Sequence, residues 1–282
     1  MVYGFNRWRS AAMVVLGCAT TAMVGVADGH GADLAVQAAP VVKAPLPAAP
    51  LSWQGFHIGV VAGAVFSDSS VTPQVAGDFL TNPNLGLYQA QYNNALGGSS
   101  TGFTIGGTIG YDWQAPAGNA AAWVFGLEAD LSYAGSGTSG TALTASMITP
   151  GQFLTKSYSI DGSWFGTARA RLGYAAGPTL FYVTGGLAVA SSGADVTIRD
   201  SMGWYAWTGS TSGTRWGWTL GGGAETRLDA HWSVKAEYLY VNLGSSSFTL
   251  NGAASNPIPS YTLNANADYA FSIVRAGLNY RF

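Results

Sequence analysis

The sequence is poor in charge and in cysteine, and these shortages narrow its class before any motif is considered. Charged residues make up 9% of the 282 positions, whereas an average soluble protein has about 25%. A surface exposed to water needs more charge than this, so the composition disfavours a soluble enzyme. The net charge of −2 and the lack of a basic cluster in the sequence exclude a nucleic-acid-binding protein.

The single cysteine, Cys18, lies in an apolar run at residues 11–27 that follows Arg7 and Arg9. A basic start, an apolar run and then small residues are the order of a secretory signal peptide, which we place at residues 1–31. The mature protein then has no cysteine and no disulfide. The letters VLGC around this cysteine would also fit a lipoprotein processing site, but the apolar run continues past them, which favours an ordinary signal peptide.

Long hydrophobic runs are also missing from the rest of the chain. No later run reaches the ~18–20 apolar residues of a membrane-spanning helix, which excludes a helical membrane protein. Residues 32–52 form a Pro/Ala-rich spacer that contains AAPVVKAPLPAAP at 38–50. This stretch has no periodicity and predicts an extended tether, which we favour over a binding segment for a periplasmic partner. The folded domain is predicted to span residues 53–282.

From residue 53 onward, apolar and polar side chains alternate with a period of two. Trp123, Phe125 and Leu127, for example, share one face, and Gly126 and Glu128 share the other. The same alternation predicts eight β-strands, at residues 53–66, 102–114, 122–133, 158–174, 179–190, 214–228, 232–243 and 270–282. The connections alternate between short (115–121, 175–178, 229–231) and long (67–101, 134–157, 191–213, 244–269). Short connections on one rim and long ones on the other are typical of an outer-membrane β-barrel.

A soluble up-and-down barrel would have the same number of strands, so the two strand faces decide between them. In a membrane barrel the apolar face points outward to lipid. The polar face here is rich in glycine, which makes room inside a narrow barrel. The apolar face carries aromatic residues near the strand ends, as in interfacial girdles, namely Trp113, Trp123, Tyr133, Tyr174, Trp216, Trp232, Tyr240 and Tyr280. We therefore predict an all-β fold, an eight-stranded antiparallel transmembrane up-and-down β-barrel with short periplasmic turns and long extracellular loops.

An ordered set of motifs adds a resemblance to a known family. The motifs are WQGFHIG (53–59), GTIGYDW (107–113), FGLEADLSY (125–133), WFGTARARLGYA (164–175), LFYVTGGLAVA (180–190), WGWTLGGGAETRL (216–228), WSVKAEYLYVNLG (232–244) and VRAGLNYRF (274–282). They resemble the small porin-family outer-membrane β-barrel proteins of Gram-negative bacteria, the branch known as major surface antigens. The resemblance implies residence in the outer membrane of a Gram-negative bacterium. It also implies that the terminal strand, with Tyr280 and Phe282, is read by the outer-membrane assembly machinery.

The inward face of the predicted strands carries nearly balanced charge, which predicts a paired network that largely fills the lumen. Its predicted members are Asp112, Glu128, Asp130, Asp161, Arg169, Arg171, Arg215, Glu225, Arg227, Lys235, Glu237, Arg275 and Arg281. If the link at 229–231 pairs Leu228 with Trp232, Glu225 falls opposite Lys235, and we expect an ion pair there. Eight strands enclose a lumen that side chains can fill, so no wide pore is expected, and a narrow ion path is the alternative.

No catalytic or metal-binding constellation is visible in the sequence. His30 is predicted to leave with the signal peptide, while His57 and His231 are predicted to lie at the periplasmic rim with exposed edges. The glycines at 221–223 lie in the middle of a predicted strand, where no phosphate loop is expected. We therefore expect no enzyme activity, no cofactor and no metal.

Three functions stay open from the sequence: a structural barrel that supports the envelope and displays surface loops, a narrow porin-like channel, and an adhesin acting through its long loops. The connection at 191–213 has a composition suited to adhesion or ligand contact, and equally to packing on neighbouring loops. The residues concerned are Arg199, Asp200, Trp204, Tyr205 and Trp207. Expected partners are outer-membrane lipid, lipopolysaccharide and, through the C-terminal strand, the assembly machinery. The last strand is expected to pair with the first, with Leu278 and Phe282 facing lipid and Arg275 facing the interior.

Overall fold

The computed structural model describes residues 52–117, 121–252, 256 and 258–282. The chain separates into two units, Met1–Ala48 and Ala49–Phe282, and the described residues belong to the second. The predicted signal peptide and all but the last residue of the predicted spacer lie outside the described residues.

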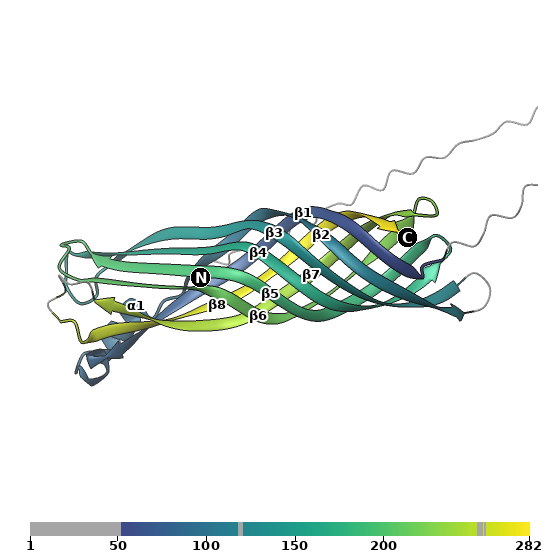
Figure 1. Cartoon of the computed structure of the whole chain (residues 1–282). Coiled ribbons are helices and arrows are strands. Elements are labelled where there is room, and N and C mark those ends of the chain that lie inside the picture. Colours follow the sequence, from purple (N-terminus) through teal and green to yellow (C-terminus); the bar gives the residue numbers. More distant parts are fainter. Residues whose placement is uncertain (1–51, 118–120, 253–255, 257) are drawn as a thin grey trace, which may run out of the picture. The chain divides into compact units, whose positions relative to one another are not determined.

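The described chain is an antiparallel barrel with two short helices in one connection (Figure 1). The strands are β1 Gly55–Gly77, β2 Leu96–Ala117, β3 Ala121–Ala145, β4 Phe153–Ala176, β5 Thr179–Asp200, β6 Ala206–Arg227, β7 Trp232–Gly252 and β8 Tyr261–Arg281. The 3₁₀-helix η1 (Asp78–Thr81) and the α-helix α1 (Leu85–Tyr92) lie between β1 and β2. Neither helix is long and apolar enough to cross a membrane.

Each strand pairs with the next along the chain, and β8 pairs with β1 to close the ring. The closing register runs from the pair His57 and Arg281 at one end to the pair Gly77 and Tyr261 at the other. Because the ring is closed, neither β1 nor β8 is an open edge. The pairing of β6 with β7 is interrupted between Thr208 and Trp218. The predicted strand number, strand order and closure are therefore confirmed.

The strands are much longer than predicted, with 21 to 25 residues each. Only about 9–11 residues are needed to cross a membrane in a tilted strand. The extra length lies at the end of the barrel with the longer connections, where segments predicted as loops continue the two-residue alternation as paired hairpins. The connections that remain at this end are residues 78–95, 146–152, 201–205 and 253–260.

The hairpins contain irregularities that the alternation alone does not predict. In β4 the pairing with β5 shifts between Gly162 and Phe165, and in β3 the pairing with β4 shifts between Tyr133 and Ser136. A bulge adds one residue to a strand and reverses which side chains point inward beyond it. Ile160 and Phe165 are consequently both buried although they are five positions apart.

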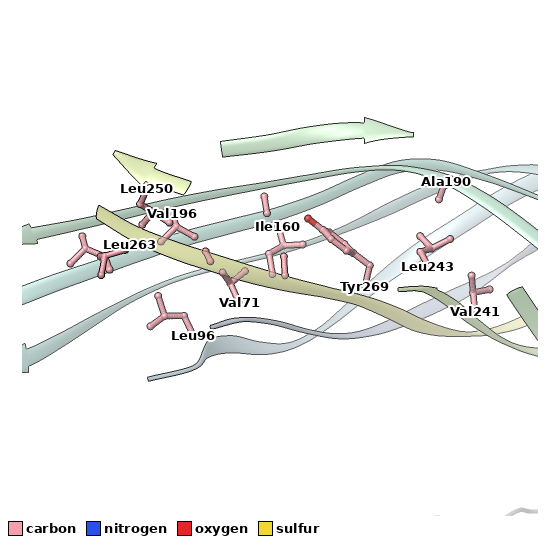
Figure 2. Close-up of a cluster of buried hydrophobic side chains, with 14 of the residues drawn as sticks. Val71, Leu96, Ile160, Ala190, Val196, Val241, Leu243, Leu250, Leu263 and Tyr269 are labelled. Atoms are coloured by element: carbon pink, nitrogen blue, oxygen red, sulfur yellow. The ribbon is translucent and has the colours of Figure 1, made fainter. Parts of the chain in front are cut away.

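The interior is filled in layers along the barrel. A small cluster around Trp53, with Val124, Leu180 and Tyr182, lies at the end with the short turns. A layer of charged side chains follows, and beyond it a large apolar cluster fills the end that carries the long hairpins (Figure 2). The ten residues of this cluster labelled in Figure 2 are Val71, Leu96, Ile160, Ala190, Val196, Val241, Leu243, Leu250, Leu263 and Tyr269.

Candidate functional site

The charged layer is the most distinctive chemical feature of the interior, and we call it the ionic layer. It holds five carboxylates and five cations, all buried, from six of the strands. Its members are Asp112, Glu128, Asp130, Glu225, Glu237, Arg169, Arg171, Lys235, Arg275 and Arg281. The structure thus brings together ten of the thirteen charged residues assigned to the lumen from the sequence.

Glu128 on β3 is the centre of this layer. Its Oε1 lies 2.6 Å from Nη2 of Arg169, and its Oε2 lies 2.8 Å from Nζ of Lys235 and 3.4 Å from Nη1 of Arg171. These partners come from β4 and from β7, so the contacts to Glu128 link both neighbouring and opposite walls. The lumen is narrow enough for long side chains to meet across it.

Two further groups complete the layer. Arg275 on β8 contacts Asp130 at 3.2 Å and Glu237 at 2.7 Å, and Arg169 contacts the same two carboxylates at 3.1 and 2.8 Å. Nearer the short turns, Arg281 contacts Asp112 at 2.7 Å. Each carboxylate of this set has at least one cation within 3.2 Å, which is the arrangement that makes buried charge tolerable.

The expected ion pair between Glu225 and Lys235 is not formed. The two residues are direct neighbours in the register of β6 and β7, as predicted. Within the described residues, however, Lys235 reaches across the lumen to Glu128, while Glu225 binds Nη2 of Arg171 at 2.9 Å. Register alone did not predict the partner of Lys235, because in so narrow a lumen a carboxylate on the opposite wall is as accessible as one on the adjacent strand.

Three predicted members lie outside the layer. Asp161 is exposed and accepts a hydrogen bond from Ser159, because the bulge in β4 reverses the inward face at this point. Arg215 is half-buried near the apolar cluster, where its guanidinium lies 4.3 Å from the ring centre of Tyr269. Arg227 is buried at the end with the short turns, and its hydrogen bonds go to backbone carbonyl groups, among them that of Ser52.

His57 was predicted to lie at the rim with an exposed edge, and this was wrong. Its side chain is fully buried on β1, with Nδ1 3.6 Å from Asp112 and Nε2 3.5 Å from Glu128. It therefore belongs to the ionic layer. Asp112 lies on the adjacent strand and Glu128 two strands away, so the position of His57 between them depends on the pairing of β1 with β2 and of β2 with β3. His231 is exposed at the rim, where its ring stacks on that of Tyr280 with centres 5.5 Å apart.

The aromatic residues predicted as girdles all lie on the outward face. Trp123 pairs directly with Tyr174 near the short turns, and ten residues farther along the same two strands Tyr133 pairs with Trp164. Ten residues at ~3.3 Å each, on strands tilted by ~40°, separate these levels by ~25 Å. That spacing equals the height of the apolar band of an outer-membrane barrel. Between the levels the outward face is apolar, with Leu127 56% exposed.

The C-terminal strand closes the barrel with its aromatic residues outside. Phe282 is 69% exposed, its N–H donates to the carbonyl of Phe56, and its ring lies 5.1 Å from that of Tyr280. Leu278 lies on the same outward face, whereas Arg275 points into the ionic layer. From Val274 onward, this strand therefore presents an apolar outward face up to Phe282.

An apolar outward band between two aromatic levels, around a polar and closed interior, defines an integral β-barrel of the outer membrane. The sequence matches the outer membrane protein beta-barrel domain over residues 34–282, and the chain belongs to this family. It is a protein of the Gram-negative outer membrane. Among the described residues, no group of three or more His, Cys, Asp or Glu side chains is arranged to hold a metal ion.

Two relatives by sequence agree with this assignment. The chain is 31% identical over 270 residues to the 31 kDa outer-membrane immunogenic protein of Brucella melitensis, covering 94% of this chain and 98% of that protein. It is 28% identical over 154 residues to a 22 kDa outer membrane protein of Rhizobium leguminosarum bv. viciae, covering 54% of this chain and 59% of that protein. Among solved structures, the outer membrane protein OprG of Pseudomonas aeruginosa is 11% identical with a TM-score of 0.39, covering 83% of this chain and 100% of that one.

Proposed function

We propose that this protein is a closed structural barrel that contributes to envelope integrity and displays its long hairpins at the cell surface, without enzyme activity. The observation that carries the proposal is the packed interior. We call the half of the barrel with the short turns the inner half and the half with the long hairpins the outer half. The ionic layer fills the inner half of the lumen, and the apolar cluster fills the outer half. An eight-stranded barrel filled in this way has little space left for solute.

The inner mouth of the barrel supports the same proposal. Trp53 is 1% exposed, its backbone N–H donates to Oε1 of Gln114 at 2.6 Å, and its carbonyl accepts from Arg281. The guanidinium groups of Arg227 and Arg281 lie 5.6 and 5.7 Å from its ring centre. Trp53 thus occupies the inner opening, where its backbone is held by hydrogen bonds and its ring by two cation–π contacts.

Planar-bilayer recording of the refolded protein tests the closed barrel. We expect no discrete openings from the wild type. Replacing Trp53 by Ala is a matched control for access to the inner mouth, and it should also stay silent because the ionic layer remains in place. Reproducible unit conductance of the wild type would overturn the proposal in favour of a narrow channel.

The outer hairpins supply the surface for display. Outside the outer aromatic level their outward face carries hydroxyl and amide pairs across strands, such as Ser247 with Asn266 and Thr249 with Asn264. We propose that this polar, mostly uncharged surface contacts the sugars of lipopolysaccharide.

An adhesin role is tested by exchanging the four outer connections while the barrel is left intact. Loss of surface binding in the exchanged protein would favour that role.

We propose a second role for the C-terminal strand, as the segment that the assembly machinery binds. The half-buried ring of Tyr280 and the exposed ring of Phe282, at the end of the apolar face that begins at Val274, support this. Phe282→Ser should lower the amount of protein assembled in the membrane more than it lowers the stability of the assembled protein. Quantification of the heat-modifiable band in membranes, beside urea unfolding of the purified barrel, compares the two effects. Equal losses in both measurements would argue against recognition of this strand.

A further inference from the structure

The outer end of the barrel contains a cavity of about 100 Å³ to which all four outer connections contribute. Phe79 and Tyr92 come from the first connection, Thr149 from the second, Tyr205 from the third and Ile258 from the fourth. A cavity built by four separate segments is typical of a binding site rather than of a packing defect between two side chains.

Six of its thirteen lining residues are aromatic, and we call five of them the aromatic cage: Phe79, Tyr88, Tyr92, Tyr205 and Trp207. Ring centres are 4.9 Å apart for Phe79 and Tyr88 and 5.4 Å apart for Tyr92 and Trp207, while Tyr205 stacks on Trp207 at 6.1 Å. Phe79 and Trp207 are almost completely buried. Several ring faces around one small space are the arrangement that attracts an organic cation.

A single carboxylate accompanies the cage. Asp200 lines the cavity, and its Oδ1 accepts a hydrogen bond from the backbone N–H of Tyr205 at 2.8 Å. Its Oδ2 is buried and has no hydrogen-bond partner among the described residues. An unpaired buried acceptor of this kind is unfavourable until a donor or a cation meets it.

No other charged side chain of the described residues lines the cavity. Burial raises the pKa of Tyr92, so its phenol stays neutral at ordinary pH. Lys156 is buried nearby, but its ammonium donates to the backbone carbonyl of Gln91 at 2.6 Å and is not part of the cavity wall. The wall therefore combines neutral aromatic rings with one negative charge.

The wall is held in place before any ligand arrives. Oε1 of Gln91 in α1 accepts from the N–H of Met147 at 2.6 Å, which ties the first connection to the second. Nε1 of Trp207 donates to the carbonyl of Tyr261 at 2.6 Å, which fixes the indole against β8. A preformed site loses less conformational entropy on binding than a flexible one.

We propose that this cavity binds the ammonium group of a small soluble organic cation, with the aromatic cage and Asp200 as its recognition elements. The volume of about 100 Å³ limits the bound group to a compact one, such as a methylated ammonium. This activity goes beyond the structural role proposed above and does not depend on it.

The position of the cavity favours a dissolved ligand over a lipid headgroup. Asp200 pairs with Leu154, ten residues along β4 from Trp164 at the outer aromatic level. At ~3.3 Å per residue and a strand tilt of ~40°, this places the cavity ~25 Å beyond the membrane interface. A phospholipid headgroup does not reach that far from the bilayer.

Calorimetric titration of the full-length mature protein in octyl glucoside, a detergent without a quaternary ammonium, tests the proposal with choline as the probe. We expect saturable binding of choline, and binding at least about tenfold weaker for 3,3-dimethyl-1-butanol, its uncharged analogue of the same shape. Asp200→Asn should weaken choline binding by about tenfold or more. Asp195→Asn, an exposed carboxylate on the same strand, makes the same change in net charge and should leave binding unchanged.

Three results would overturn the proposal: no binding of choline to the wild type, equal binding of its uncharged analogue, or equal loss in the two aspartate variants. If Asp200→Asn fails to give a heat-modifiable barrel, Tyr205→Leu replaces it, because this half-buried ring belongs to the cage without being in the barrel core. Unchanged choline affinity in a folded Tyr205→Leu variant would equally exclude the aromatic cage as the recognition element.

Discussion

The inner and outer halves of this barrel are lined by the same eight strands, yet they are filled in opposite ways. The inner half is packed by long charged side chains that meet across the lumen, such as Arg169 on β4 and Glu237 on β7. The outer half is packed by aliphatic side chains, such as Leu250 and Leu263, both fully buried. Water is therefore excluded from one half of the lumen by paired charged side chains and from the other half by aliphatic side chains.

The difference follows from how much space each kind of side chain needs. In the inner half, glycine faces the charged groups, and a Cβ at Gly126 would lie 2.1 Å from Oδ1 of Asp112. The missing Cβ leaves room for the side chains of Asp112 and Arg171, which contact each other there. The apolar half contributes net stability by burial, whereas the ionic layer is balanced between desolvation and attraction and mainly specifies one arrangement of the strands. The two halves should consequently respond differently to mutation.

The largest effect is expected from Glu128→Gln. The change leaves Arg169, Arg171 and Lys235 without their shared carboxylate, and an uncompensated buried charge costs about 3–5 kcal/mol. We expect a loss near the upper end of this range, about 5 kcal/mol, in the free energy of unfolding measured by urea titration of the folded barrel. The exposed Asp161→Asn serves as control and should change it by less than about 0.5 kcal/mol. A loss below about 1 kcal/mol for Glu128→Gln would mean that the ionic layer does not act as a connected network.

A somewhat smaller effect is expected in the outer half from Leu263→Ala. This fully buried side chain belongs to the apolar cluster, and its truncation leaves a cavity that costs about 3 kcal/mol. Because no charge is involved, the loss should not change with salt concentration. Leu131→Ala, at a lipid-facing position that is 63% exposed, removes the same atoms without a cavity and should cost less. A salt-dependent loss in Leu263→Ala would contradict the division of the interior into two kinds of packing.

The next effect is a difference within the ionic layer. Double-mutant cycles should give a coupling energy of about 1–3 kcal/mol for Lys235 with Glu128, which are in contact. For Lys235 with Glu225, which are neighbours only in register, we expect less than about 0.5 kcal/mol. A larger coupling energy for Lys235 with Glu225 than for Lys235 with Glu128 would mean that the cross-strand ion pair is formed and the pair across the lumen is not.

The features that sequence alone predicts are those carried by local alternation. Eight strands, their order, the closure of β8 on β1 and the neighbourhood of Glu225 and Lys235 all follow from a two-residue period and short turns. The girdle position of Trp123 follows from the same parity. The closure also requires that an outer-membrane barrel leave no open edge. Each of the other features needs information only from a strand and its immediate neighbour.

The features that were missed depend on bulges or on contacts across the lumen. The bulge in β4 moved Asp161 outward. Lys156 was assigned to a connection, although Leu154, Lys156 and Ile160 continue the alternation with opposite parity, a signal that could have revealed both the longer strand and the bulge. His57 could not be assigned from its own strand, because two other strands determine which carboxylates surround it.

The smallest effect separates the barrel interior from the turns that connect its strands. Asp229 lies in the exposed turn between β6 and β7, where the N–H groups of Trp232 and His231 both donate to its Oδ1 at 2.7 Å. These two hydrogen bonds lower the pKa of the Asp229 carboxyl, and the bond from Trp232 has the larger effect. A group whose pKa is lower in the folded state stabilises the fold above its unfolded pKa of about 3.9, and this stabilisation is lost as the pH falls through the folded value.

Asp229→Asn should therefore be slightly less stable than the wild type at neutral pH, and the two urea midpoints should converge as the pH is lowered below about 4. The amide can still accept from the same N–H groups, so the residual difference reports the charge alone. The midpoint difference between Glu128→Gln and the wild type, measured over the same pH series, supplies the comparison, because that variant disrupts a buried network rather than an exposed turn. If the Asp229→Asn difference stayed constant down to pH 3, the turn would be stabilised by the shape of the side chain and not by its charge.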